Sequence, residues 1–424
     1  MRHKRGMVQA PAEQTRENAP DIRQRLLRAA QAQILAAGFH DASVDQIARR
    51  AGASKQTIYA HFPSKEHLFQ EVLRLTLEEA GQADEPDITA LSFEDAVRAY
   101  IEWTEKSALN PQNLELYRAN IAATVAFPQL AGELHHLRLT ASHMGASLLA
   151  HPGGTRLPEG PPARLSSWLG VLAMAGPRAL LGFSASAEER RARHAAIMQI
   201  CNGGWTVPVS PVPVTHASDA LAEPADHGHG ESNSRIPAER WTELLRIAVR
   251  QFIQTGLRKT SVEEISATAQ ISKMTIYKRF GNKQGLFAAA VDQAVSDLLV
   301  QRPAITGSGD IGSALEAIAL EQDRFTRQAD YAALLRLMIT EAPGHAAMIR
   351  HAWNRLTLPT QSVLAARLRQ WHGEEIIHLI DPDIAAEQFL LLATRGNRRL
   401  TDTIPWDETE ARTHAREVTT LFYR

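Results

Sequence analysis

Two short stretches of the chain concentrate side chains that can hydrogen-bond to nucleic acid. They read SKQTIYAHFPSKEHLF, residues 54–69, and SKMTIYKRFGNKQGLF, residues 272–287. Lys and Gln can bond the edges of bases in a DNA groove, and Thr, Tyr and His can bond phosphate oxygens. Both stretches therefore predict noncovalent recognition of DNA.

The sequence pattern around each stretch occurs in two copies, and the residues predicted to contact DNA lie at equivalent positions in both, except that Lys278 has no counterpart among those of the first copy. In the first copy they are Ser43, Lys55, Gln56, Thr57, Tyr59, His61 and Lys65. In the second copy they are Ser261, Lys273, Met274, Thr275, Tyr277, Lys278, Arg279 and Lys283. Met274 replaces Gln56, and it would favour an apolar contact such as a thymine methyl. With Lys278 and Arg279, the second copy is expected to depend more on phosphates and to bind with greater sensitivity to salt.

Two short helices joined by a tight turn are expected to position these side chains. The pattern SVDQ, residues 43–46, is a capping box that begins the first helix, and Ser54 caps the second. Gly52 lies in the turn, where glycine adopts a positive φ at low cost. Ile58 and Phe62 are four residues apart and face inward. This is the pattern of a helix-turn-helix, whose second helix enters the major groove.

The whole chain consists of two copies of one domain. Residues 38–69 and 256–287 align without gaps and are identical at 14 of 32 positions. Apolar residues recur with helical period, and each copy is expected to contain about nine helices. The predicted organisation is a disordered basic arm (1–20), a DNA-binding domain (21–69), a helical ligand-binding and dimerisation domain (70–203), a linker (204–236), a second DNA-binding domain (237–287) and a second helical domain (288–424).

Charge is distributed unevenly along the 424 residues. The formal net charge is −1, yet residues 1–69 and 236–287 each carry a net +5, which leaves −11 for the remainder. Two basic modules in an acidic chain are typical of nucleic-acid binding. Cys201 is the only cysteine, so no intrachain disulfide can form, and a cytoplasmic location is expected. No apolar run is long enough to span a membrane, and the basic, polar N-terminus does not resemble a secretory signal.

The repeated sequences also resemble a known family. GFHDASVDQIARRAGASKQTIYAHFPSKEHLFQEVL and GLRKTSVEEISATAQISKMTIYKRFGNKQGLFAAAV closely resemble the N-terminal signature of TetR/AcrR transcriptional repressors. FPQLAGEL and DPDIAAEQFLLLATRGNRRL resemble AefR-like C-terminal regions. The resemblance implies an all-α chain of two tandem TetR-like units, each with a three-helix DNA-binding domain and a larger helical bundle. It also implies DNA contacts by Thr57, Tyr59, His61 and Lys65, and by Thr275, Tyr277, Arg279 and Lys283.

The duplication leaves open how the two copies pair, because members of this family usually carry one unit and dimerise through their last two helices. We favour an intrachain pseudo-dimer, with interface helices near 168–183, 187–200, 385–400 and 408–423. A homodimer that pairs like copies is one alternative. A second copy that no longer binds DNA is another, and Gln270 favours it because a positive φ there would cost on the order of 1 kcal/mol.

A pseudo-dimer would read a pseudopalindromic operator whose two half-sites differ. Half-sites in such operators lie roughly 34 Å apart, which is one turn of DNA. The linker permits this arrangement, since about 30 flexible residues have a root-mean-square span of roughly 30 Å.

Each helical bundle is expected to bind a small apolar inducer. Candidate pocket residues are Trp103, Tyr117, His136, His143 and Trp353, although each can equally be an ordinary core or surface residue. The sequence shows no phosphate-binding loop, dinucleotide fingerprint, metalloprotease motif or nucleophile elbow, so no enzyme activity, cofactor or metal is expected. The alternative function is a helical ligand-binding or scaffolding protein in which DNA binding by the second copy is reduced or lost.

Overall fold

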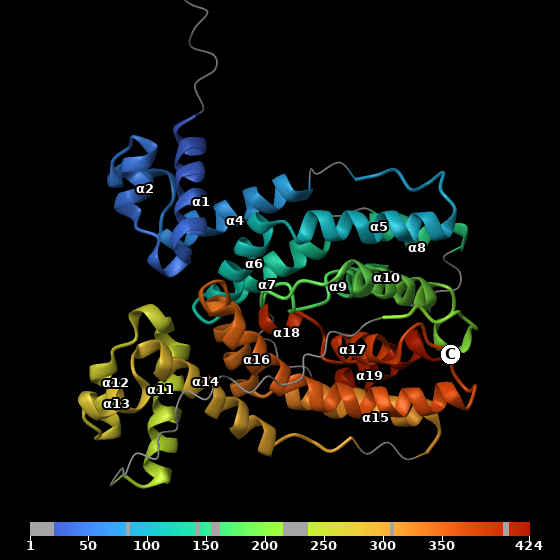
Figure 1. The fold of residues 1–424 in the computed structure, drawn as a ribbon. Coiled ribbons are helices and arrows are strands. Elements are labelled where there is room, and N and C mark those ends of the chain that lie inside the picture. Colours follow the sequence, from blue (N-terminus) through green and yellow to red (C-terminus); the bar gives the residue numbers. More distant parts are fainter. Residues whose placement is uncertain are drawn as a thin grey trace, which may run out of the picture. The chain divides into compact units, whose positions relative to one another are not determined.

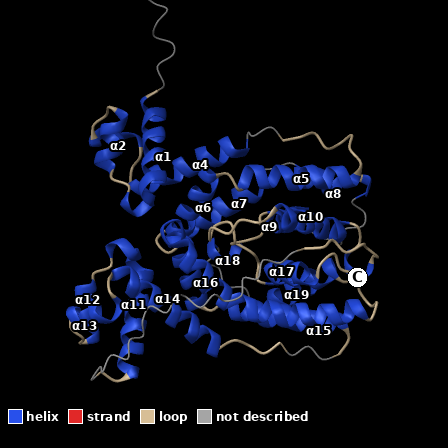
Figure 2. Cartoon of the chain, viewed as in Figure 1, coloured by secondary structure: helices blue, strands red, loops and turns tan. Residues whose placement is uncertain are grey.

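The computed structural model describes residues 21–81, 85–140, 144–153, 162–214, 236–305, 309–401 and 407–424. All regular secondary structure in these ranges is helical, as predicted (Figure 2). The chain forms two compact units, Met1–Thr76 and Leu77–Arg424. None of the described helices is both long and apolar enough to cross a membrane.

The first unit contains the helices of the first DNA-binding module. These are α1 (Ile22–Asp41), α2 (Val44–Ala51), α3 (Lys55–His61) and the beginning of α4 (Lys65–Gly81). Leu26, Ile47, Ile58 and Phe62 are almost completely buried and form the core with Phe69. The inward pair Ile58 and Phe62 therefore faces the core as the sequence predicts.

The second unit begins with the first copy's bundle and includes the whole second copy. Its helices from the first copy are α5 (Phe93–Ala108), α6 (Pro111–Ala123), α7 (Pro128–Thr140), α8 (Met144–Ala150), α9 (Pro162–Ala173) and α10 (Ala187–Cys201). Those of the second are α11 (Ala238–Lys259), α12 (Val262–Ala269), α13 (Lys273–Phe280), α14 (Lys283–Val300), α15 (Ile311–Thr326), α16 (Ala329–Gly373), α17 (Pro382–Ala393), α18 (Arg398–Thr401) and α19 (Glu408–Phe422).

Helices of the two copies share one hydrophobic core. Helix α17 contacts both α9 and α10, and α6 of the first copy contacts α16 of the second. The shared core includes Trp168, Leu172 and Ile197 from the first copy and Phe389 and Phe422 from the second. The helices α5–α10 accordingly lie beside α15–α19 in Figure 1. The predicted interface helices are therefore packed together within one unit.

The contacts across this core are reciprocal. Gly176 approaches Leu391 so closely that an added Cβ would overlap the leucine side chain, and Gly396 approaches Val171 in the same way. In the aligned sequences Gly176 corresponds to Gly396, and Val171 corresponds to Leu391. A contact in which equivalent residues exchange roles is the property of a two-fold interface. The packing at these glycines is therefore reciprocal between the two bundles.

The same equivalence holds for the hydrogen bonds that support this region. In the first copy, Arg118 Nε donates to the carbonyl oxygen of Leu180 at 3.0 Å. In the second, Arg336 Nε donates to the carbonyl oxygen of Leu400 at 3.1 Å. Each guanidinium holds the chain just after its close-approach glycine, so both copies keep the backbone of the interface in the same place.

The first part of the predicted linker is packed structure. Residues Gly204–Thr206 form the short 3₁₀ helix η2, and Trp205 is 2% exposed. Its ring lies 4.9 Å from that of Phe422 and 6.0 Å from that of Phe389. Further along, the Val212 N–H donates to the Ile380 carbonyl oxygen at 3.2 Å. The spacing of apolar residues could not predict that this part of the linker packs on the core, because an extended Val-Pro segment has no helical repeat. Residues 215–235 lie outside the described ranges.

Replacing Trp205 tests this packing. Trp205→Ala is expected to lower the free energy of unfolding of the second unit by about 3–5 kcal/mol, because it leaves a large cavity in the shared core. Urea unfolding followed by far-ultraviolet circular dichroism measures the change. The control is Val300→Ala, at a side chain that is 88% exposed, which should change stability by less than about 0.5 kcal/mol. Equal effects of the two substitutions would show that Trp205 belongs to a spacer.

Candidate nucleic-acid interface

The turn of the first module is built from two capped helix ends. Ser43 Oγ accepts from the Gln46 N–H at 3.4 Å, and Ser54 Oγ accepts from the Thr57 N–H at 3.0 Å. Gly52 adopts φ 62° and ends α2 in the left-handed conformation. The predicted capping box is only half formed, because the Gln46 side chain accepts a hydrogen bond from Gln33.

The first residues of α3 are presented to solvent. Lys55, Gln56 and His61 are exposed, and Tyr59 is 44% exposed, which is unusual for so large an aromatic ring. Buried Ile58 fixes the opposite face of the helix. Ser64 Oγ accepts from the His67 N–H at 3.1 Å and caps the next helix, where Lys65 is the first residue. Lys55, Gln56 and Tyr59 therefore share one side of α3, His61 ends the helix, and Lys65 begins α4.

The second module repeats this geometry. Ser261 Oγ accepts from the Glu264 N–H at 3.3 Å, and Ser272 Oγ accepts from the Thr275 N–H at 3.2 Å. Ile276 of α13 is buried. At the turn, Gln270 adopts φ 52°, so a non-glycine residue takes the left-handed conformation of Gly52. Arg240 Nη2 donates to the Gln270 carbonyl oxygen at 3.0 Å and supports this turn.

Each module carries an ion pair across the turn. Lys55 Nζ lies 3.4 Å from Asp45 Oδ1, and Lys273 pairs with Glu263 at the equivalent position. The hydrogen bond from Lys273 lowers the pKa of the Glu263 carboxyl, and the pKa of Lys273 is raised in turn. In each module the ion pair fixes the direction of the lysine side chain at the start of the recognition helix (α3 or α13) and places a negative charge beside it. Sequence analysis identified these lysines but not their partners.

Other cations of the second module are held by neighbouring groups. Lys283 Nζ donates to the Arg258 carbonyl oxygen at 2.9 Å, and the Arg279 guanidinium lies 4.7 Å from the centre of the Trp241 ring. Lys278 is exposed, and Met274 is 79% exposed. The outer face of α13 therefore combines an apolar side chain with positioned positive charges.

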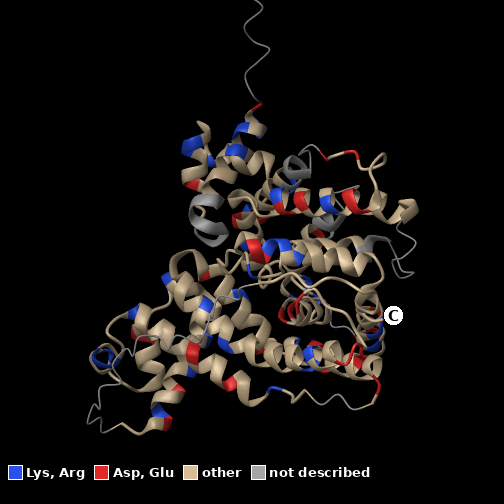
Figure 3. Ribbon diagram, turned by 45° about the vertical axis from the view of Figure 1, so that its right-hand side comes forward, with Lys and Arg blue, Asp and Glu red and all other residues tan. Residues whose placement is uncertain are grey.

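A basic hollow lies beside the turn of the first module. Its lining includes Arg25 and Arg28 of α1 and Arg50 of α2, next to Gly52. Sequence analysis did not identify these arginines as candidate contacts, although their charges contribute to the excess in residues 1–69. Figure 3 shows the Lys and Arg positions of both modules in blue.

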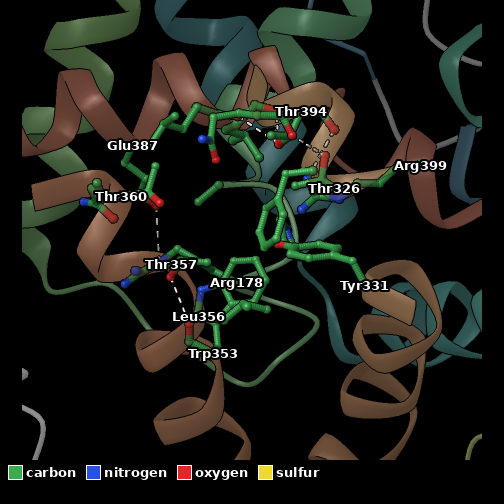
Figure 4. Close-up of a pocket in the computed structure, with 17 residues that line it drawn as sticks. Arg178, Thr326, Tyr331, Trp353, Leu356, Thr357, Thr360, Glu387, Thr394 and Arg399 are labelled. Carbon is green, nitrogen blue, oxygen red and sulfur yellow. Dashed lines mark hydrogen bonds and ion pairs between the residues drawn. The ribbon is translucent and has the colours of Figure 1, made fainter. Parts of the chain in front are cut away.

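The candidate pocket residues do not converge on one site. Trp353 lines a cavity in the second copy with Tyr331 and Arg399 (Figure 4). Tyr117 belongs to the hydrophobic core, and Trp103 packs at the edge of another core. The side chain of His136 and all of His143 lie outside the described residues. Arg399 was missed by sequence analysis, because its burial depends on elements distant in the sequence.

Cys201 is completely buried, and this burial raises the pKa of its thiol to about 12. A nucleophilic cysteine needs an accessible thiolate at neutral pH. The geometry of Cys201 is that of a core residue.

Comparisons with known proteins agree with this architecture. The model of bacterial regulatory proteins of the tetR family matches residues 26–72 and again residues 244–290. The model of the AefR-like transcriptional repressor C-terminal domain matches residues 313–424. The chain is therefore a member of the tetR family with a duplicated N-terminal domain.

Individual relatives match shorter segments. The HTH-type transcriptional regulator BetI of Yersinia pestis is 33% identical over 115 residues, which are 26% of this chain and 58% of BetI. The chain thus spans little more than half the length of this relative. SrpR of Pseudomonas putida, also an HTH-type transcriptional regulator, is 42% identical over 62 residues, 15% of this chain and 29% of SrpR. The match to a TetR family transcriptional regulator from Pseudomonas syringae pv. tomato covers 44% of this chain and 97% of that chain, with 23% identity and a TM-score of 0.33.

The two turns allow a matched test of backbone strain. Gln270→Gly is expected to stabilise the second module by about 0.5–1 kcal/mol, because the left-handed cost of about 1–2 kcal/mol exceeds the added chain entropy of glycine. Gly52→Gln should destabilise the first module by a similar amount. A Cβ at Gly52 would meet no atom within 4 Å, so that substitution isolates the backbone effect. Peptide-resolved hydrogen exchange measures each module separately, and a loss of protection in Gln270→Gly would contradict the strain argument.

Proposed function

We propose that the chain is a ligand-responsive transcriptional regulator that binds operator DNA in the cytoplasm and acts as a repressor. The observation that carries the proposal is the duplicated helix-turn-helix, in which both copies retain the capped turn, the buried isoleucine and the exposed reading face. The AefR-like repressor domain matched at residues 313–424 supports the repressor role. By this proposal Thr57, Tyr59 and Lys65, with their counterparts in the second copy, contact DNA.

The proposal includes an intrachain pseudo-dimer. Its support is the reciprocal packing of Gly176 on Leu391 and of Gly396 on Val171, because such isologous contacts normally join two chains of a dimer. Here both sides of the interface come from one polypeptide. One chain would then supply both reading helices to one operator.

The two half-sites of that operator are proposed to differ. Exposed Met274 occupies the position of Gln56 and favours an apolar base edge, whereas Gln56 can make a bidentate bond to adenine. Lys278 and Arg279 replace Ala60 and His61 and add positive charge for phosphate contacts. A symmetric palindrome would therefore suit neither module fully.

Helix α16 provides a physical connection between the cavity and the second module. Glu341 Oε1 accepts from the Leu257 N–H at 2.9 Å, at the end of α11. The ring of His345 lies 5.6 Å from that of Phe287 in α14. Tyr331 lies in the same part of α16 as Glu341, before the non-helical residue His345, and lines the cavity. A ligand that shifts α16 would therefore move contacts that position the second reading helix.

The salt dependence of binding tests the DNA contacts. Lys65→Gln and Lys283→Gln are each expected to weaken binding to a duplex selected by the protein from random-sequence DNA. Each should also reduce the magnitude of the slope of log K against log salt by about 0.9, the value for one lost phosphate contact. Fluorescence anisotropy gives both the affinity and the salt slope. The control is Lys106→Gln, at an exposed lysine of α5.

The result separates the possible functions. An effect of Lys65→Gln alone would show that the second module does not bind DNA. Effects no larger than that of Lys106→Gln for both variants would favour the ligand-binding or scaffolding alternative.

The mass of the free protein tests the pseudo-dimer. Light scattering is expected to give a value near 46.7 kDa, the mass of one chain, because the reciprocal interface is already occupied within the molecule. The complex with a short operator duplex should contain one chain per duplex. Twice that mass for the free protein would mean that chains pair with each other, and the proposal of asymmetric half-sites in one operator would then fail.

A further inference from the structure

A cavity lies in the second copy, and the first copy contributes part of its wall (Figure 4). Its apolar surface includes Phe325, Tyr331 and Trp353. Arg178, from the segment after α9, belongs to the same lining. Aromatic walls with a few polar groups are typical of sites for small organic molecules.

Arg399 gives the cavity a charged group that forms no ion pair with a carboxylate of the described residues. Its Nη1 donates to the Thr394 carbonyl oxygen at 3.2 Å, and its guanidinium lies 5.5 Å from the centre of the Tyr331 ring. Its Nε is buried and has no hydrogen-bond partner among the described residues. Burial lowers the pKa of Arg399 from its usual range, and Tyr331 and the Asp323 carboxylate offset part of this effect. An anion at this position would supply the missing partner.

The nearby carboxylates are already engaged by other arginines. Asp323 is 1% exposed and lies 2.9 Å from Arg395 Nε and 3.1 Å from Arg327 Nε. Glu387 lies 2.6 Å from Arg193 Nη2 and 3.6 Å from Arg178 Nε.

Glu189 belongs to the same network, 2.9 Å from Arg193 and 3.5 Å from Arg178. These three carboxylates face four arginines, and Arg399 adds a fifth. The surroundings of the cavity therefore carry an excess of positive charge.

Three of these five arginines belong to the second copy and have no charged counterpart in the first. In the aligned sequences, Arg327, Arg395 and Arg399 correspond to the uncharged residues Leu109, Ala175 and Ala179 of the first copy. The reciprocal contacts common to both copies do not by themselves require arginine at these positions. Of the three, Arg399 lines the aromatic cavity.

We infer that the cavity binds an amphipathic organic anion, such as an aromatic carboxylate. Its acid group pairs with Arg399, since guanidinium and carboxylate form bidentate, charge-assisted hydrogen bonds. Its ring packs against Tyr331 and Trp353. Because Arg178 of the first copy also lines the cavity, the bound anion touches both halves of the chain. Binding at this site does not depend on the proposed function; only a role of the site in regulation rests on it.

Calorimetry with two matched probes tests the site. The full chain is expected to bind 1-naphthoate at least about tenfold more tightly than uncharged 1-naphthamide, as expected for a hydrogen bond to a charged group. Arg399→Gln should remove this preference and leave the affinity for the amide within about twofold. Arg398→Gln is the control, because Arg398 is exposed and does not line the cavity. Arg399→Lys keeps the charge without the planar fork and should retain part of the preference.

Equal binding of the two probes, binding of neither, or a preference unchanged in Arg399→Gln would overturn the site. If Arg399→Gln loses its helical circular dichroism, Arg399→Lys decides, and an undiminished preference in that variant would equally overturn it. Anisotropy with operator DNA separates the site from the proposed function. Binding of 1-naphthoate through Arg399 without any change in DNA affinity would support the site and contradict ligand-responsive regulation. Salt-dependent DNA binding together with equal affinity for 1-naphthoate and 1-naphthamide would support DNA binding and overturn the anion site.

Discussion

The close approach of two glycines to the opposite copy is the constraint on which the second unit depends. Gly176 and Gly396 have positive φ, and each lies against a side chain of the other copy. A side chain at either position would separate α9 from α17 and open the shared core. That core in turn holds Trp205 and places Arg178 in the wall of the cavity. The interface therefore determines the shape of the candidate ligand site as well as the pairing of the copies.

Duplication within one chain removes the requirement that both halves remain identical. A homodimer must change both partners together, whereas here each copy can change alone. The second copy holds Arg399 where the first has Ala179, and Gln270 where the first has Gly52. Gln270 lies away from the reciprocal contacts, whereas Arg399 lines the cavity together with Leu391, the side chain against Gly176. The reciprocal contacts have thus been kept while residues at the turn and in the cavity have diverged.

Much of the fold could be predicted because its signals are local. Caps such as Ser54 and Ser272, and apolar residues at helical spacing, depend only on neighbours a few positions away. The cavity could not be predicted, since residues 178 and 399 meet only through the packing of the two copies. The role of Trp205 was missed for a related reason, because nothing in its Pro-rich surroundings indicates the aromatic partners at Phe389 and Phe422.

The ion pairs beside the reading helices relate this architecture to specificity. Asp45 and Glu263 place carboxylates next to the lysines that would face DNA, where they repel phosphate and favour a fixed lysine direction. Exposed pairs of this kind are weak, so each lysine can exchange its carboxylate for a nucleic-acid acceptor. Nonspecific association gains less from a lysine that already has a partner, whereas a correctly placed base edge still offers a directed hydrogen bond. Under the proposed function, the acidic partner would lower affinity for every sequence and preserve more of it for the cognate one.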